Sequence, residues 1–228
     1  ATIRATSPLV IIPTPIFMES PKLNLQIFAI RPHPIILATN ATITNPIENR
    51  RIGKFISSIS VFNPMEAKKM FGYVSDNPDV FLKLKGIDYL NFLADIYDVD
   101  EKTRKERIEG LCKIFEINDV LNNKIESYSH GMRQKLIIIG SLVHNPNNWI
   151  IDEPMIGLDP KASYELKKIM KKMADENKTV FFSTHILDVA EKVCDRIGII
   201  NNGEVIFVGT IEQMRNELKE NKSLEELF

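Results

Sequence analysis

Short apolar segments alternate with segments of helical periodicity along residues 62–228, and this alternation restricts the possible folds more than any other feature. The apolar segments expected to form strands include residues 71–75, 149–151 and 180–182. The residues between them carry apolar side chains every three or four positions, which is the period of an amphipathic helix. Strands separated by helices usually pair in parallel, so the sequence predicts an α/β fold with a parallel sheet.

The expected helices are defined by their apolar faces. The first two faces consist of Leu90, Leu93, Ala94 and Tyr97, and of Ile108, Leu111, Cys112 and Phe115. A third helix is expected over about residues 132–143. A fourth should begin with Asp159 as its N-cap and Pro160 in its first turn, and should bury Leu166, Ile169, Met170 and Met173. One more helix, strands at 197–200 and 205–208 and a last helix complete the predicted order.

Residues 1–61 differ in composition from the rest of the chain. They contain seven Pro, one Gly and no Asp, and their net charge is +4, whereas residues 62–228 have a net charge of −5. Alternation at Leu23, Leu25 and Ile27 favours a short strand, but the prolines argue against a central one. We therefore expect an anomalous segment at 1–61, which leaves the N-terminal part of the sheet in doubt.

Reactive side chains follow two of the expected strands. Asp152 and Glu153 follow one strand directly, and His185 follows another. Ligands of open α/β sheets bind beyond the carboxyl ends of the strands. There, one carboxylate could hold Mg²⁺, the next could activate a water, and an imidazole could reach a γ-phosphate. An isolated Asp-Glu pair is equally well explained as a solvated loop, and an isolated His as a structural residue, but their joint occurrence favours a site.

Overall composition excludes several classes of protein. A net charge of −1 argues against a protein that binds nucleic acid mainly by charge. No apolar run approaches the roughly 20 residues needed to span a bilayer, and the first residues lack the pattern of a secretory signal. Cys112 and Cys194 have no metal-ligand spacing and are expected to be buried thiols. These features predict a soluble intracellular domain.

Four short motifs occur in an order and spacing that together are specific. They are Tyr128–Lys135, Ile150–Pro154, Gly157–Pro160 and Ser183–His185, and with them residues 62–228 resemble the ATPase domain of ABC transporters. Within that family the chain most resembles the ATPase subunits of ABC-2-type exporters, as shown by residues Tyr73–Pro78, Ile87–Phe92 and Ser223–Phe228. The resemblance implies a P-loop-NTPase-like parallel sheet, with a core lobe at 62–76 and 131–228 and an inserted helical subdomain at 77–130.

The resemblance also implies roles for individual residues. Asp152 would be the Walker B aspartate at the Mg²⁺ site, Glu153 the catalytic glutamate and His185 the switch histidine. Asp159 would lie in the D-loop, and Asp76 matches the Q-loop position. The signature loop would be Ser129, His130, Gly131 and Met132.

The same resemblance implies cofactors and partners. ATP and Mg²⁺ would bind between two subunits arranged head to tail, with the signature loop of one subunit facing the ATP of the other. The second ATPase subunit could be a copy of this chain or a different cassette. The helical subdomain would dock on a transmembrane permease subunit, which places the chain peripherally on the cytoplasmic face of the plasma membrane. No nucleic-acid partner is implied.

One family motif is missing from the sequence. The phosphate-binding motif G-x-x-x-x-G-K-[ST] does not occur, and Gly53-Lys54 is followed by Phe55, which cannot hold Mg²⁺. Lys54 also lies only 19 positions before Tyr73, too close for the helix and strands of the family. We therefore predict weak ATP binding and negligible hydrolysis. His130 in place of a signature glycine and Asp76 in place of the Q-loop glutamine are milder departures.

Several explanations remain open at this stage. Residues 1–61 could derive from translation in a wrong frame, or could be a replacement that makes a non-catalytic cassette. A non-catalytic binding partner is the main alternative function. A translation or nucleic-acid ATPase with the same cassette is less favoured, because such proteins usually carry a second cassette or long coiled-coil insertions.

Overall fold

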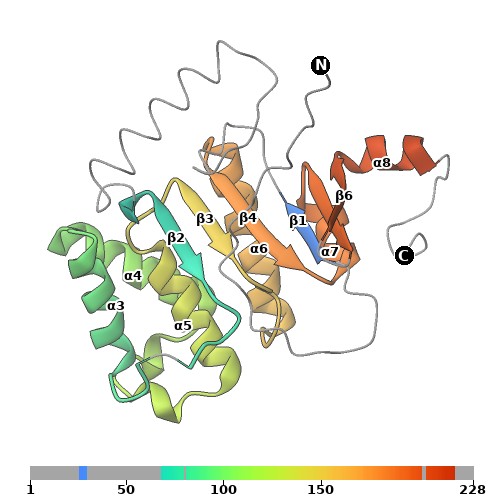
Figure 1. The fold of residues 1–228 in the computed structure, drawn as a ribbon. Helices are drawn as coiled ribbons and strands as arrows, with labels where there is room; N and C mark the ends of the chain where they lie inside the picture. The colour runs from blue at the N-terminus through green and yellow to red at the C-terminus, as the bar shows by residue number, and fades with distance from the viewer. Residues whose placement is uncertain (1–25, 30–67, 80, 202–203, 219–228) are drawn as a thin grey trace, which may run out of the picture. The chain divides into compact units, whose positions relative to one another are not determined.

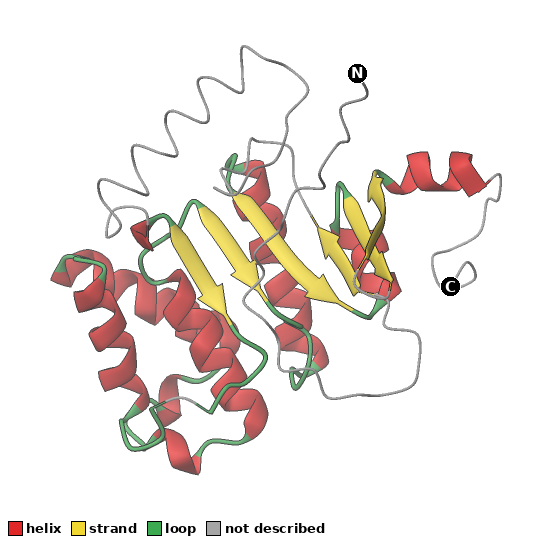
Figure 2. Ribbon diagram, in the orientation of Figure 1, coloured by secondary structure: helices red, strands yellow, loops and turns green. Residues whose placement is uncertain are grey.

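Six strands form one mixed sheet in the computed structural model, which describes residues 26–29, 68–79, 81–201 and 204–218 (Figures 1 and 2). The strand order is β2-β3-β4-β1-β5-β6. The strands are β1 (Gln26–Ala29), β2 (Phe71–Val74), β3 (Asn148–Ile151), β4 (Thr179–Thr184), β5 (Ile197–Asn201) and β6 (Glu204–Gly209). The chain divides into two units, and every element described here belongs to the one formed by residues 24–33 and 69–228.

The parallel part of the sheet consists of β2, β3 and β4. Phe71 pairs with Asn148, and Asn148 with Thr179, so the three strands run in the same direction and end at one edge. This arrangement confirms the predicted α/β fold with a parallel sheet. The sequence predicted strands close to β1, β5 and β6 but not their antiparallel direction. Only two residues separate β5 from β6, and so short a connection allows only antiparallel pairing.

The position of β1 corrects one expectation. The proline content of residues 1–61 argued against a central strand, yet β1 lies between β4 and β5. The four residues of β1 include no proline, so their N–H groups are available to both neighbouring strands. The alternation that favoured a short strand began at Leu23, whereas the strand itself begins at Gln26. The rest of residues 1–61 lies outside the described part of the chain.

The helices are α3 (Gly86–Ile96), α4 (Glu101–Phe115), α5 (His130–Leu142), α6 (Pro160–Asp175), α7 (Leu187–Val193) and α8 (Ile211–Leu218), with 3₁₀ turns η1 (Asn118–Val120) and η2 (Ile125–Ser127). The predicted apolar faces of α3, α4 and α6 are confirmed, since most of their residues are buried and the others partly so. Helix α5 begins two residues earlier than predicted because Ser129 caps it. Among the described helices, none is long and apolar enough to cross a bilayer.

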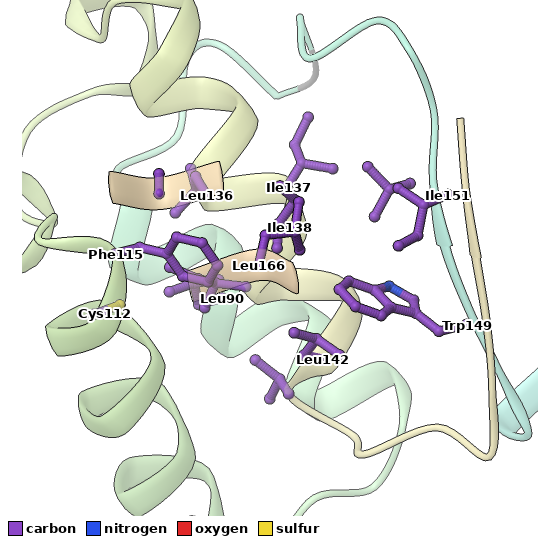
Figure 3. Packing of buried hydrophobic residues seen from close by; sticks show 14 of the residues in the cluster. Leu90, Cys112, Phe115, Leu136, Ile137, Ile138, Leu142, Trp149, Ile151 and Leu166 are labelled. Carbon is purple, nitrogen blue, oxygen red and sulfur yellow. The ribbon is translucent and has the colours of Figure 1, made fainter. Parts of the chain in front are cut away.

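The main core joins the helices to the parallel strands. Figure 3 shows Trp149 and Ile151 of β3 beside Leu142 and Ile138 of α5, and all four are buried. The indole N–H of Trp149 donates to Ser141 Oγ at 2.9 Å, so the largest core side chain has its polar atom satisfied. Helix α5 also packs on β2, and α6 and α7 pack on β4. This packing fixes the edge at which the parallel strands end.

Candidate functional site

The carboxyl ends of β3 and β4 bring Asp152 beside Ser183. In the parallel register Ile151 pairs with Phe182, so the next residues, Asp152 and Ser183, are neighbours across the two strands. The Ser183 hydroxyl donates to Asp152 Oδ1 and accepts from the Glu153 backbone N–H at 3.2 Å. The backbone N–H of Asp152 donates to the carbonyl of Val74 in β2 at 2.9 Å. Three strands therefore hold the Asp152-Glu153 pair in place.

Glu153 and His185 form the second contact at this edge. His185 Nδ1 lies 2.8 Å from Glu153 Oε1, so the tautomer protonated at Nδ1 donates a hydrogen bond to the carboxylate. The Glu153 side chain is 18% exposed and that of His185 62% exposed. Burial raises the pKa of Glu153, and the hydrogen bond from His185 opposes that shift. Glu153 also has a φ of 43°, an uncommon conformation for a residue with a side chain. We call Asp152, Glu153, Ser183 and His185 the strand-end cluster.

Asp76 and Asp152 of the strand-end cluster both act electrostatically on Tyr73 of β2. Burial, followed by the charges of Asp152 and Asp76, raises the pKa of the Tyr73 phenol. Both carboxylates are thus within electrostatic range of one side chain that projects from β2. The structure gives no hydrogen bond between Asp76 and the strand-end cluster.

The oxygen atoms at this edge are compatible with Mg²⁺. Mg²⁺ is usually held by one or two carboxylates, with waters and substrate phosphates completing the shell. Asp152 is a half-exposed carboxylate whose position is fixed by Ser183, which suits that role. Within the described residues, no group of three or more His, Cys, Asp or Glu side chains forms a complete metal cage. The donor set therefore fits a metal that arrives with its own ligands better than a fully protein-bound ion.

The predicted signature residues lie at the start of α5. Ser129 is the N-cap, and its hydroxyl accepts from the Met132 N–H at 3.3 Å. Met132 is partly buried against the main core. The first N–H groups of a helix lack partners within the helix and attract anions. The Ser129–Met132 turn is thus a capped helix N-terminus, a type of structure that can bind an anion.

This turn packs against the loop that follows the strand-end cluster. A Cβ atom on Gly131 would lie 2.5 Å from the carbonyl oxygen of Gly157, so the two backbones touch. Gly157 has a φ of 77°, and the imidazole of His130 lies against its Cα. His130 therefore fills the space that a side chain at position 157 would need.

Asp159, the N-cap of α6, lies beside the Ser129–Met132 turn through its contact with Lys135. Its Oδ1 accepts from the Ala162 N–H at 2.8 Å, which confirms the predicted N-cap. Its Oδ2 lies 2.6 Å from Lys135 Nζ of α5. The hydrogen bond from Lys135 is the main cause that lowers the pKa of Asp159. We call residues 129–132, Gly157, Asp159 and Lys135 the turn cluster.

The predicted site residues therefore fall into two groups. Asp152, Glu153 and His185 lie in the strand-end cluster with Asp76 nearby, and the other five lie in the turn cluster. The short loop from Glu153 to Leu158 connects the groups, and the Ile156 N–H donates to the Glu153 carbonyl within it.

Three residues of these clusters had no predicted role. Gly157 was noted only as the first residue of a motif. Ser183 was noted only as part of a motif, although the parallel register would place it beside Asp152. Lys135 also lay within a motif and received no role. Its partner is on another helix, so local sequence gives no signal for the pair. Gly53 and Lys54 lie outside the described residues.

Comparison with known proteins gives consistent matches. The family model described as ABC transporter matches residues 36–156, and the match begins within the segment 1–61. The ABC-type transporter ATP-binding protein EcsA of Bacillus subtilis is 32% identical over 167 residues, which cover 73% of this chain and 68% of EcsA. The ABC transporter ATP-binding protein NatA of the same organism is 31% identical over 156 residues, or 68% of this chain and 63% of NatA.

A relative from Nostoc and two solved structures extend the comparison. The uncharacterized ABC transporter ATP-binding protein all4389 is 32% identical over 64% of this chain, but the match covers only 44% of that relative. This chain thus spans less than two thirds of the length of the first relatives, from 43% to 63%. A structure described as an ATP binding subunit of an ABC transporter has a TM-score of 0.70 at 31% identity, over 74% of this chain and 70% of that one. CbiO1 from Clostridium perfringens, part of the complex cbiONQ, has a TM-score of 0.55 at 25% identity, over 68% of this chain and 62% of that one.

Proposed function

The chain belongs to the ABC transporter family, and we propose that it is an ATP-binding subunit whose own ATP hydrolysis is impaired. It would act as one half of a head-to-tail dimer that drives export through a separate transmembrane permease at the inner face of the plasma membrane. The observation that carries this proposal is the strand-end cluster, in which Ser183 fixes Asp152 and His185 contacts Glu153.

The residues of the strand-end cluster suit phosphoryl chemistry. Asp152 would hold Mg²⁺, which when bound neutralises phosphate charge and polarises a phosphoryl oxygen. Glu153 would orient a water and accept its proton, and the pKa raised by burial makes it a stronger base than an exposed glutamate. His185 holds the Glu153 carboxylate in one orientation through the 2.8 Å contact and remains exposed enough to meet a phosphate.

The residues of the turn cluster suit a different task. The N-terminus of α5 presents backbone N–H groups, and the contact between Gly131 and Gly157 fixes its position relative to the loop after Glu153. By resemblance, this surface would face the ATP of the second subunit, with Asp159 at the dimer contact.

The impairment follows from what the sequence lacks. The sequence contains no G-x-x-x-x-G-K-[ST], the motif whose glycine-rich loop surrounds the phosphates and whose lysine neutralises them in P-loop ATPases. A second candidate function follows from the same observation. A non-catalytic cassette could still offer its Ser129–Met132 turn to the ATP of a complete partner cassette.

Titration calorimetry of the full chain with Mg-ATP tests the proposal. We expect no saturable binding at micromolar nucleotide with the chain alone. Tight binding that is lost in Asp152→Asn would show that the phosphates are held after all and would contradict the impairment. If binding appears only when a complete ABC cassette is added and is weakened by Ser129→Arg, the non-catalytic cassette is the better description.

A further inference from the structure

A cavity of about 360 Å³ lies between α6, the start of β4 and the end of α7. None of its lining residues belongs to the strand-end cluster or the turn cluster. Small-molecule sites usually measure about 300–1,000 Å³, so the cavity is at the small end of that range.

The inner part of the cavity is apolar. Val180 and Phe182 project from β4 into it, and Met170 of α6 and Val193 and Cys194 at the end of α7 complete this part. Phe182 and Met170 are each 2% exposed, so these side chains are anchored in the core and form a fixed surface. An occupant would therefore need an apolar body.

The rim of the cavity is basic. Lys167, Lys168 and Lys171 of α6 and Lys192 of α7 line it, and Asp195 is the one acidic residue among the lining residues of the described chain. Lys168 is paired with Glu165 at 3.2 Å and lies 5.5 Å from the centre of the Tyr164 ring. Lys192 is paired with Asp188 at 2.7 Å.

Lys167 and Lys171 differ from the other rim lysines. Neither forms an ion pair with an acidic side chain among the residues that the structure describes. They lie one turn apart on α6, where like charges repel and weaken the helix. Lys167 is also partly buried, which reduces the screening of its charge by water. An anion at the rim would relieve this repulsion.

We propose that the cavity binds an anionic amphiphile, with its carboxylate or phosphate between Lys167 and Lys171 and its acyl or aromatic body against Phe182 and Met170. The volume favours a single short chain over a two-chain lipid held whole. Such an occupant would also brace α6 against α7, and these helices begin beside Asp159 and His185 respectively. The proposal does not depend on whether the chain binds or hydrolyses ATP.

The test uses the full chain with ¹³C-methyl methionine and follows its NMR signals during titration with decanoate below its micelle concentration. Met170 reports on the cavity and is assigned with Met170→Leu, whereas Met132 at the turn cluster serves as an internal control. We expect decanoate to shift the Met170 signal saturably and to leave Met132 unchanged. Decanol, which has the same body without the charge, should bind at least tenfold more weakly.

Charge variants test whether Lys167 and Lys171 bind the anion. The double variant Lys167→Gln/Lys171→Gln should bind decanoate at least tenfold more weakly and decanol as before, whereas Lys172→Gln, on the same helix but outside the cavity, should bind like the unmodified chain. If the double variant unfolds, Lys171→Gln alone carries the comparison. No saturable shift, equal binding of decanoate and decanol, or unchanged binding in the folded double variant would overturn the proposal.

Vesicles distinguish the source of the ligand. Sedimentation with vesicles containing phosphatidic acid that depends on the same two lysines would support the site with a membrane lipid as its ligand. Binding of decanoate without binding to vesicles would support it with a free, soluble anion.

Discussion

Replacement of Gly157 by alanine tests the packing of the turn cluster. Gly157 has a φ of 77°, and a Cβ atom there would lie 2.8 Å from Nε2 of His130, well inside contact distance. The left-handed backbone costs an alanine about 1–2 kcal/mol. Because the His130 ring is exposed, it can rotate away, and we expect the lost packing to add about 1 kcal/mol. Gly157→Ala should therefore lower the free energy of unfolding by about 2–3 kcal/mol.

A double-mutant cycle separates the two contributions. In a His130→Ala background the steric part disappears, so Gly157→Ala should cost only about 1–2 kcal/mol, which leaves a coupling of about 1 kcal/mol. The assay is urea unfolding of the full chain followed by circular dichroism. Equal costs of Gly157→Ala in both backgrounds would refute the reasoning, since His130 would then not oppose a side chain at position 157.

Two glycines provide matched controls for the cycle. A Cβ on Gly131 would meet the backbone oxygen of Gly157 at 2.5 Å, and no side-chain rotation relieves that contact. Gly131→Ala should therefore stay costly in the His130→Ala background. Gly110 lies in the exposed part of α4, and a Cβ atom there would meet no other atom within 4 Å. Gly110→Ala should therefore stabilise the chain by about 0.5–1 kcal/mol.

Three further predictions concern pH and buried hydrogen bonds. Burial lowers the pKa of His144, so the folded state disfavours its protonation, and the free energy of unfolding should fall as the pH drops below about 6.5, the ordinary histidine value. Ser183→Ala leaves the Glu153 N–H without its acceptor and should cost about 1–3 kcal/mol in urea unfolding. Ser141→Ala removes the acceptor of the Trp149 N–H, which is buried, and should cost about 1–3 kcal/mol, with a changed emission of this single tryptophan.

The predictions for His144 and Ser183 each have a control. The variant His144→Gln should lose part of the pH dependence, and an unchanged slope between pH 8 and pH 5.5 would assign it to other groups. The Ser127 hydroxyl donates to the local Lys124 carbonyl and is exposed, so Ser127→Ala should cost less than about 0.5 kcal/mol. A similar cost for Ser127→Ala and Ser183→Ala would contradict the bridging role of Ser183.

The strand-end cluster was largely predictable because it depends on local features. Each reactive residue follows an apolar strand directly, and parallel strands end at the same edge. The contact between Glu153 and His185 also depends on the positive φ of Glu153. A positive φ is usually indicated by a glycine, and position 153 is a glutamate, so the sequence did not predict this conformation.

Features set by tertiary packing were not predictable. The pair Lys135–Asp159 joins two helices whose relative position depends on the whole core. The central position of β1 was mispredicted because the prolines were counted over the whole segment, although the strand needs only a short proline-free stretch. The antiparallel direction of β1 likewise has no local signal.

The most direct test of the central claim is steady-state Mg-ATP hydrolysis by the full chain, measured beside Glu153→Gln. The account predicts that both proteins show the same background rate with no saturation, because the phosphate-binding motif is missing. A saturable rate that the Glu153→Gln variant loses would contradict it and would show that this chain is a complete ATPase.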